Sequence, residues 1–189
     1  FALSDYSKDP RLKDFPGEIR DAKRFLQGLR KVFGKKARII YKHGNHEERY
    51  ERYLQFKCPE LIGVPAFDWA EVFGLAEQGI ELVRQKRVVR LGKLNVIHGH
   101  EYRFQISSPV NPARGFFLRA KAHVLGGHFH QSSEHSEKNV EDKVVSCWST
   151  GALCDLRPEY RPLNNWNSGF AIVGVGKDGS FEVQNHRII

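Results

Sequence analysis

Apolar residues recur every three or four positions along several stretches of the chain, which is the spacing of a helix with one buried face. The clearest stretch follows Pro16 and ends at Gly34, a residue typical of helix ends. Asp68 is placed to cap a short helix that ends near Leu75. On this pattern we predict helices over residues 16–33, 47–56, 68–75 and 113–122.

Short apolar runs alternate with these helices and have the length and composition of β-strands. The runs at 79–83, 87–91 and 94–97 are close enough to form a hairpin or a meander, and Lys177-Asp178-Gly179 is a hairpin turn. Further strands are predicted over 38–42, 124–125, 144–148, 169–175 and 180–184. The alternation favours an α/β fold, with antiparallel structure increasing toward the carboxyl end, as a single domain over residues 1–189.

Three of the predicted strands are followed directly by glycine and histidine. The segments are Gly44-Asn45-His46-Glu47, His98-Gly99-His100 and Gly127-His128-Phe129-His130. Ligands bind where the strands of an α/β sheet end, and neutral imidazole is a common metal ligand, so these segments predict a metal-binding edge of the sheet. On extended backbone His128 and His130 would point to the same side, so two neighbouring metal ions could each take one.

The three segments resemble ordered sequence blocks of the calcineurin-like metallophosphoesterase family. That family is recognised by an Asp-x-His, a Gly-Asp-x-x-Asp, a Gly-Asn-His-Asp/Glu, a strand ending in His, and a Gly-His-x-His. The last three blocks occur here, in this order, within residues 38–130. The resemblance implies an α/β sandwich of two mixed β-sheets flanked by helices, whose N-terminal strands are missing from this chain.

The first two blocks are absent, since no Asp-x-His or Gly-Asp-x-x-Asp occurs before Gly44. The chain also contains no methionine, although a translated reading frame begins with one. We therefore expect that the chain is a fragment and that the Asp which bridges both metal ions lies upstream of Phe1. On this expectation the fragment alone binds metals poorly and is inactive.

Residue by residue, the resemblance implies that Asn45, His98 and His128 bind one metal ion and that His130 binds a second. The ions are divalent, with manganese expected first and iron, zinc or nickel as alternatives. His46 is implied to be the catalytic residue, which donates a hydrogen bond or a proton to the phosphate or the leaving oxygen. The implied reaction is hydrolysis of a phosphomonoester or phosphodiester by a hydroxide that bridges the two ions.

Each of these residues also has a purely structural interpretation, in which Asn45 serves a turn and the histidines lie in the core or on the surface. Glu47 and Glu101 are expected to start a helix or to face solvent. Supporting or solvent positions are expected for His43, His100 and His123, and surface positions for His135 and His186.

Two further sets of residues are able to contact a substrate. The loop at 164–170 carries aromatic and amide side chains, which either line a cleft or serve only the loop. Arginines near the histidine segments can bind phosphate through paired hydrogen bonds, although solvated arginine is the simpler interpretation for each of them: Arg49, Arg52, Arg103 and Arg114.

Composition narrows the alternatives. The chain is 40% hydrophobic and 28% charged, which is typical of a soluble globular protein. Its 3 cysteines include no Cys-x-x-Cys pair and indicate reduced thiols, so a cytoplasmic protein is expected. No apolar run reaches membrane-spanning length, so no membrane partner is expected. A net charge of +8 fits either a solvated basic surface or nucleic acid or nucleotides as partners.

A second class of function stays open, in which a degraded phosphoesterase scaffold acts as a non-catalytic nucleic-acid or partner-binding module. The sequence before Phe1 separates the two classes, because an enzyme requires both Asp blocks there. A mononuclear zinc hydrolase is disfavoured, since the chain has no His-Glu-x-x-His. Among enzymes, a nuclease or nucleotide phosphodiesterase fits the basic charge, whereas the short length argues against a protein phosphatase.

Overall fold

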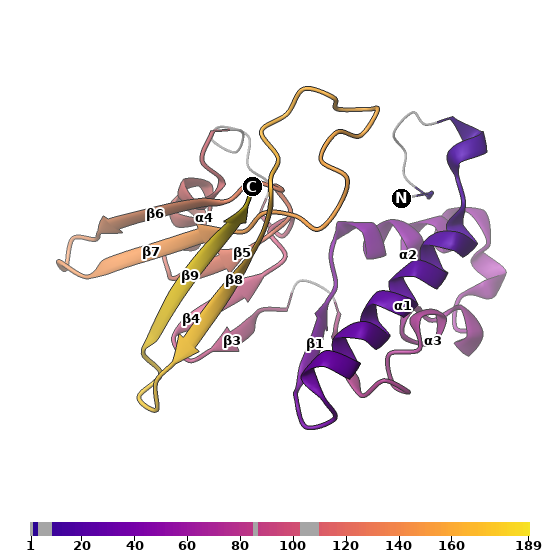
Figure 1. Ribbon diagram of the computed structural model, residues 1–189, viewed down its shortest axis with the longest axis horizontal. Helices are drawn as coiled ribbons and strands as arrows, with labels where there is room; N and C mark the ends of the chain where they lie inside the picture. The colour runs from indigo at the N-terminus through magenta and orange to yellow at the C-terminus, as the bar shows by residue number, and fades with distance from the viewer. Residues whose placement is uncertain (1, 4–8, 85–86, 103–109) are drawn as a thin grey trace. The chain divides into compact units, whose positions relative to one another are not determined.

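The computed structural model describes residues 2–3, 9–84, 87–102 and 110–189, which divide into two units at residue 85 (Figure 1). Helices and several β-sheets occur together, so the chain is an α/β protein, as the sequence predicted. The finer prediction of a metallophosphoesterase-type sandwich stays a prediction, as does that of a single domain.

The first unit, residues 1–85, places helices around a pair of parallel strands. Its elements are α1 (Phe15–Phe33), β1 (Ile39–Lys42), α2 (Asn45–Lys57), α3 (Trp69–Phe73) and β2 (Ile80–Val83), and short 3₁₀ turns cover Pro10–Leu12, Pro59–Leu61 and Pro65–Phe67. β1 and β2 pair in parallel, with Ile39 opposite Ile80. A parallel pair requires a crossover connection, and the segment that contains α2 and α3 supplies it.

Local sequence signals explain where these helices begin and end. The Asp14 side chain accepts a hydrogen bond from the backbone N–H of Gly17 at 2.9 Å, which caps the start of α1. Gly34 ends α1 with a φ of 72°, a conformation that costs glycine little. Asp68 accepts a hydrogen bond from the N–H of Ala70 at 2.8 Å and so caps α3, as predicted.

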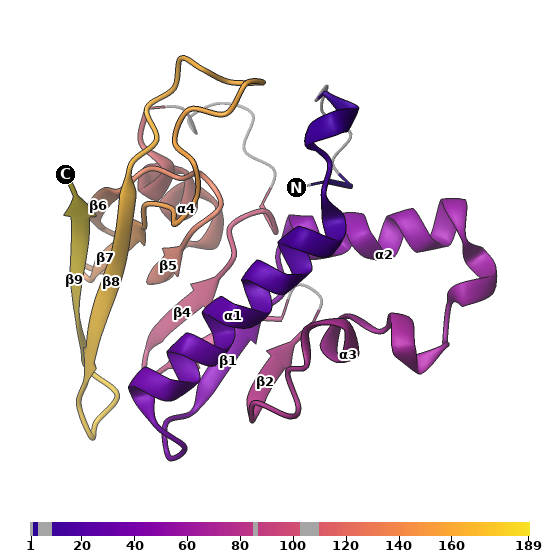
Figure 2. The same ribbon diagram turned by 45° about the vertical axis from the view of Figure 1, so that its right-hand side comes forward.

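An aromatic core joins the helices to the parallel strands. Trp69 of α3 is buried and stacks on Phe73, with ring centres 4.2 Å apart. Leu26 of α1 and Ile80 of β2 are buried in the same cluster, so α1 packs along the β1–β2 pair (Figure 2). Removal of this apolar surface from water favours folding of the unit.

One guanidinium ties the end of α1 to the segments that lead into both strands. Arg30 donates hydrogen bonds to the backbone oxygens of Gln78 and Gly79, each at 2.8 Å. The same side chain donates to the oxygen of Gly34 at 2.9 Å and to that of Ala37 at 2.7 Å. Because these carbonyls precede β1 and β2, the bonds help to set where the strands start.

The second unit, residues 86–189, contains a mixed sheet that is covered on both faces. Its elements are β3 (Val89–Leu91), β4 (Leu94–Ile97), α4 (Pro112–Ala120), β5 (Val124–Gly126), β6 (Ser133–Lys138), β7 (Val144–Ser149), β8 (Ser168–Val175) and β9 (Phe181–Ile188). The five-stranded sheet has the order β3-β4-β5-β7-β6, in which β4, β5 and β7 run parallel and the outer pairs are antiparallel. β8 and β9 form the predicted hairpin.

The two faces of this sheet belong to separate cores. On one face, Phe116 of α4 is buried in a cluster with Val124 and Cys147. On the other face, Leu94 and Trp148 pack against apolar residues of the β8–β9 hairpin. The sheet is therefore the middle layer between α4 and the hairpin (Figure 2).

Most of the predicted elements are confirmed, and the structure differs from the prediction at a few places. α2 begins at Asn45 rather than at Glu47, and Tyr53, which the spacing places on the buried face of this helix, is exposed. β2 pairs with β1 instead of forming a meander with β3 and β4. The pattern does not predict β6, because Ser133–Lys138 contains no apolar residue.

The state of the three cysteines agrees with the sequence analysis. The thiols of Cys58, Cys147 and Cys154 are free, as expected for reduced cysteines. Burial raises the pKa of the Cys147 thiol to about 11, so this thiol stays protonated at neutral pH.

Within the described ranges, no helix combines the length and the apolar character that crossing a membrane requires.

Phe116→Ala is expected to lower the free energy of unfolding by about 3–5 kcal/mol, because the ring is fully buried between α4 and the sheet. The matched control is Leu118→Ala on the same helix, whose exposed side chain should cost about 0.5 kcal/mol or less. Urea denaturation followed by circular dichroism measures both changes. Equal losses in the two variants would contradict the inner face assigned to α4.

Candidate metal-binding site

The parallel pairing of β4 and β5 brings two of the predicted ligands together. Ile97 of β4 lies opposite Gly126 of β5, so His98 and His128 follow at the same end of the sheet. The N–H of Gly127 donates to the carbonyl oxygen of His98 at 3.0 Å, which extends the ladder by one step. The ring centres of His98 and His128 lie 5.2 Å apart.

A tight turn at Gly99 brings a third imidazole, that of His100, close to His98 and His128. Gly99 has a φ of 116°, and a Cβ atom there would lie 3.0 Å from the oxygen of Gly127 and 3.0 Å from the Cβ of His128. Glycine is the residue that accepts this close approach without strain. The ring centre of His100 consequently lies 5.0 Å from that of His98 and 6.1 Å from that of His128. We call His98, His100 and His128 the histidine cluster.

A buried carboxylate supports this turn. Glu101 accepts hydrogen bonds from the backbone N–H of His98 at 3.1 Å and from that of Gly99 at 2.5 Å. Its side chain is 9% exposed, and one of its oxygens lies 3.7 Å from Nδ1 of His100. The prediction that Glu101 starts a helix or faces solvent is therefore wrong. Its role depends on the turn at Gly99, which residue types alone do not reveal.

The loop after β5 departs from extended backbone at both of its histidines. His128 and His130 have φ values of 68° and 59°, in the left-handed region that is uncommon for residues other than glycine. The expectation that an extended strand directs both side chains to one side is therefore wrong. Conformations of this kind concentrate at functional sites, where the surrounding structure maintains them.

His130 lies against the loop that contains Trp166. Their ring centres are 4.3 Å apart, and Nδ1 of His130 lies 3.7 Å from Sγ of Cys154. Burial lowers the pKa of His130, and the charge of Arg161 lowers it further. The imidazole is therefore neutral at neutral pH, and a neutral ring is the form that binds a metal ion. Trp166 is thus a member of the loop at 164–170 that contacts a predicted ligand.

Amide side chains of this loop bond to the segments beside it. Asn167 is buried, and its side chain accepts from the N–H of Ser132 at 2.8 Å and donates to Oγ of Ser132 at 2.8 Å. Asn164 donates to the carbonyl oxygens of Leu156 and Arg161, each at 2.8 Å. For these two residues the bonds favour a structural role over a place in a substrate cleft.

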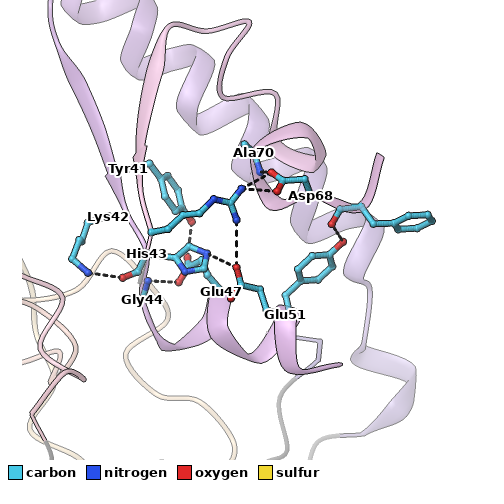
Figure 3. Close-up of polar contacts among 11 residues, drawn as sticks. Tyr41, Lys42, His43, Gly44, Glu47, Glu51, Asp68 and Ala70 are labelled. Atoms are coloured by element: carbon cyan, nitrogen blue, oxygen red, sulfur yellow. Dashed lines mark hydrogen bonds and ion pairs between the residues drawn. The ribbon is translucent and has the colours of Figure 1, made fainter. Parts of the chain in front are cut away.

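The remaining histidine segment lies in the first unit, at the start of α2. Gly44 is the residue before the helix, Asn45 is half-buried and His46 is exposed. Glu47 accepts a hydrogen bond from the N–H of Gly44 at 2.8 Å and another from the hydroxyl of Tyr41 at 2.6 Å (Figure 3). Burial, and after it the charge of Glu47, raises the pKa of Tyr41, so its hydroxyl remains a donor. Glu47 therefore lies in the first turn of α2, where its side chain caps the helix start, and it fixes the backbone that carries Asn45 and His46.

His43 is a buried imidazole between β1 and α2. Its side chain is 2% exposed, and its Nε2 lies 3.7 Å from Oε1 of Glu51 (Figure 3). Its ring meets Trp69 edge to face with centres 6.1 Å apart, and its backbone N–H donates to Val83 at 3.0 Å. Burial lowers the pKa of His43 and outweighs the nearby carboxylates, which act in the opposite direction. His43 is thus a structural residue of the first unit.

The other histidines and the arginines have less specific positions. Nδ1 of His123 accepts a hydrogen bond from the N–H of Ser146 at 3.2 Å, so His123 links the start of β5 to β7. His186 is exposed, while His135 is half-buried and contacts Glu137 at 2.7 Å. Of the arginines, those at the surface are Arg52 and Arg114, Arg49 is half-buried, and Arg103 lies outside the described residues.

The geometry of the histidine cluster can be compared with that of a metal site. A histidine nitrogen lies about 2.0–2.1 Å from a bound ion, so two rings around one ion have centres on the order of 5 Å apart. His98 and His128, at 5.2 Å, fit this requirement. Across residues 2–3, 9–84, 87–102 and 110–189, however, no group of three or more His, Cys, Asp or Glu side chains is arranged to hold an ion. A complete site therefore needs further ligands.

Comparison with known proteins adds no assignment. No protein-family model matches the chain, and no curated protein matches it. The similarity to calcineurin-like metallophosphoesterases therefore rests on the three histidine segments.

Gly99→Ala is expected to destabilise the protein by about 1–3 kcal/mol, because the new methyl group meets Gly127 and His128 at a φ that strains alanine. The matched control is Gly28→Ala within α1, where nothing lies within 4 Å of the added Cβ and stability should rise by about 0.5–1 kcal/mol. Urea denaturation gives both values. A gain of stability in both variants would contradict the close approach at Gly99.

The free energy of unfolding is expected to fall as the pH drops below 6.5, because the unfolded chain then binds a proton at His43 that the folded chain resists. The folded pKa is the lower one, so this stability is present at higher pH and lost on the acid side. His43→Gln should therefore flatten the slope between about pH 7.5 and about pH 5.5. Exposed His186→Gln is the control. Guanidinium denaturation at each pH measures the slope, and an unchanged slope in His43→Gln would refute the argument.

Proposed function

We propose that the protein hydrolyses a phosphomonoester or phosphodiester with two divalent metal ions, and that it adopts the two-sheet sandwich of the calcineurin-like metallophosphoesterases. The supporting observation is the meeting of His98 and His128 at the ends of two parallel strands, with ring centres 5.2 Å apart. The carboxyl ends of parallel strands are a common place for ligand sites. Both histidines also belong to the segments whose order resembles that family.

In this proposal His98 and His128 bind one ion together with Asn45, and His130 binds the other. Neutral imidazole nitrogens suit manganese less strongly than iron, nickel or zinc, so several divalent ions can compete for these ligands. Burial lowers the pKa of His130, which keeps its ring available as a neutral ligand. When bound, the ions would neutralise charge on the phosphoryl oxygens and make hydroxide available near neutral pH.

Other residues of the chain orient these groups. Glu101 bonds two backbone N–H groups of the Gly99 turn and so holds the backbone of His98 in place. His46 is exposed at the start of α2, and in this proposal its imidazole donates a hydrogen bond or a proton to the leaving oxygen. Glu47 fixes that helix start through Gly44. His46 is thus the proton donor of the proposed reaction, and His98, His128 and His130 are its metal ligands.

Manganese binding tests the ligand assignment independently of activity. Mn²⁺ broadens the NMR signals of nuclei close to it. Small additions to the 189-residue chain should therefore broaden the ring signals of the histidine cluster and of His130 before those of exposed His186. His128→Ala should remove the selective broadening at His98, and His186→Ala should preserve it. Uniform broadening of all histidine signals would contradict the assignment.

Hydrolysis is tested on the full-length protein with phenyl phosphate and phenyl diesters in the presence of Mn²⁺. His128→Ala is expected to lower turnover by about 10²-fold or more, since even the loss of groups that support metal ligands costs 10–100-fold. His46→Ala should cost about 10²–10⁴-fold, and less with nitrophenyl esters, whose leaving group needs no proton. His186→Ala is the control. Unchanged turnover in folded His128→Ala would overturn the proposal, and nucleic-acid binding without hydrolysis would favour a non-catalytic module.

A further inference from the structure

The first unit contains a cavity that the proposed reaction does not use. It has a volume of about 510 Å³ and lies between α2, the segment at 59–67 and α3. Its size falls within the range of small-molecule sites, which is about 300–1,000 Å³. All of its lining residues belong to residues 1–85, so the first unit alone forms it.

One side of the cavity is apolar and reaches solvent. Ile62, Val64 and Phe67 line it and are 54%, 40% and 38% exposed. Leu54 of α2 adds to the same wall. Large apolar side chains that are exposed around one cavity indicate a binding surface, which the apolar part of a ligand can cover.

The other side of the cavity carries an excess of negative charge. Glu51, Asp68 and Glu71 line it together with Arg84, so three carboxylates minus one guanidinium leave two negative charges. Nη2 of Arg84 bonds both oxygens of Asp68, at 2.5 and 2.6 Å, whereas Nη1 lies 3.4 Å from Glu51. Asp68 also caps α3 through Ala70, so its charge already serves the fold. Glu51 and Glu71 are therefore the carboxylates that a ligand can use.

A deeply buried imidazole points toward one of these carboxylates. Nε2 of His43 lies 3.7 Å from Oε1 of Glu51, which is longer than a hydrogen bond, and within the described part of the chain this nitrogen has no hydrogen-bond partner. The ring is directed at Glu51 on the wall of the cavity (Figure 3). Among the described residues, Glu51 accepts one long hydrogen bond from Nη1 of Arg84 at 3.4 Å and lies 3.7 Å from Nε2 of His43. A short contact to this carboxylate is left for a ligand to make.

These features together favour a cation over a phosphate group. Although the chain carries a net charge of +8, the lining of this cavity is negative, so a phosphate is repelled there. We propose that the cavity binds a small organic cation, an ammonium or guanidinium group carried on an aromatic or aliphatic body. Glu51 and Glu71 bind the charged group, and Ile62, Val64 and Phe67 cover the body.

Matched small-molecule probes, added to the ¹⁵N-labelled 189-residue chain, test the charged group and the apolar body of the ligand separately. 2-Phenylethylamine has both parts, 2-phenylethanol lacks the charge, 3-phenylpropionate reverses it, and methylamine lacks the body. 2-Phenylethylamine should shift the amide signals of Gln55 and Gly63, which line the cavity. It should bind about tenfold or more tightly than each of the other three probes.

Substitutions of the cavity carboxylates test which of them bind the charged group of the probe. Glu71→Gln removes a carboxylate that has no hydrogen bond or ion pair among the described residues, so the fold should not change. It should weaken 2-phenylethylamine roughly two- to fivefold and leave 2-phenylethanol unchanged. Glu51→Gln should act in the same direction. The matched control is Glu60→Gln, an exposed carboxylate outside the cavity lining, which should alter neither probe.

Several outcomes would overturn the cation site. Equal binding of 2-phenylethylamine and 2-phenylethanol would show that charge is not selected. Equal effects of Glu71→Gln and Glu60→Gln would show that the cavity carboxylates do not bind the charge, and the absence of shifts at Gln55 and Gly63 with every probe would exclude binding. The site does not rest on phosphoester hydrolysis, so His128→Ala should bind 2-phenylethylamine as the unaltered chain does.

Discussion

The parallel pairing of β4 with β5 is the constraint on which the histidine cluster depends. The register that sets Ile97 opposite Gly126 also sets the positions of His98 and His128 one and two residues further on. The same register needs a glycine at 126, because a Cβ atom there would lie 2.7 Å from the ring of Phe116. Packing of α4 on the sheet and placement of the imidazoles are therefore coupled, and a change that moves the helix also moves the site.

Sequence reasoning succeeded where a residue acts on its own neighbours. Gly34 ends a helix and Asp68 caps one through backbone geometry within a few residues, so both could be predicted. It failed where the outcome depends on distant packing. The left-handed backbone of His128 has no local cause such as glycine, and Glu101 is buried only because the turn at Gly99 directs it inward.

The candidate site shows the same division. His98 and His128 were predictable together, because apolar runs identified their strands and the carboxyl ends of parallel strands meet. The neighbouring position of His100 depends on the φ of Gly99, which the sequence does not specify. The cavity in the first unit could not be predicted, since its walls come from separate segments whose residues show no shared motif. Its negative lining differs from the basic balance of the whole chain, so overall charge is a poor guide to an individual site.

The polar strand β6 also has a consequence for how copies of the protein meet. β6 is an outer strand of the five-stranded sheet, and an outer strand exposes backbone groups that can pair with a strand of another molecule. Its residues include Glu134, Glu137 and Lys138, all exposed. A second sheet that docked along this edge would have to bury or oppose those charges, which disfavours edge-to-edge aggregation. The polar composition of β6, which prevented its prediction from the hydrophobic pattern, thus also disfavours pairing of this sheet edge with a strand of another molecule.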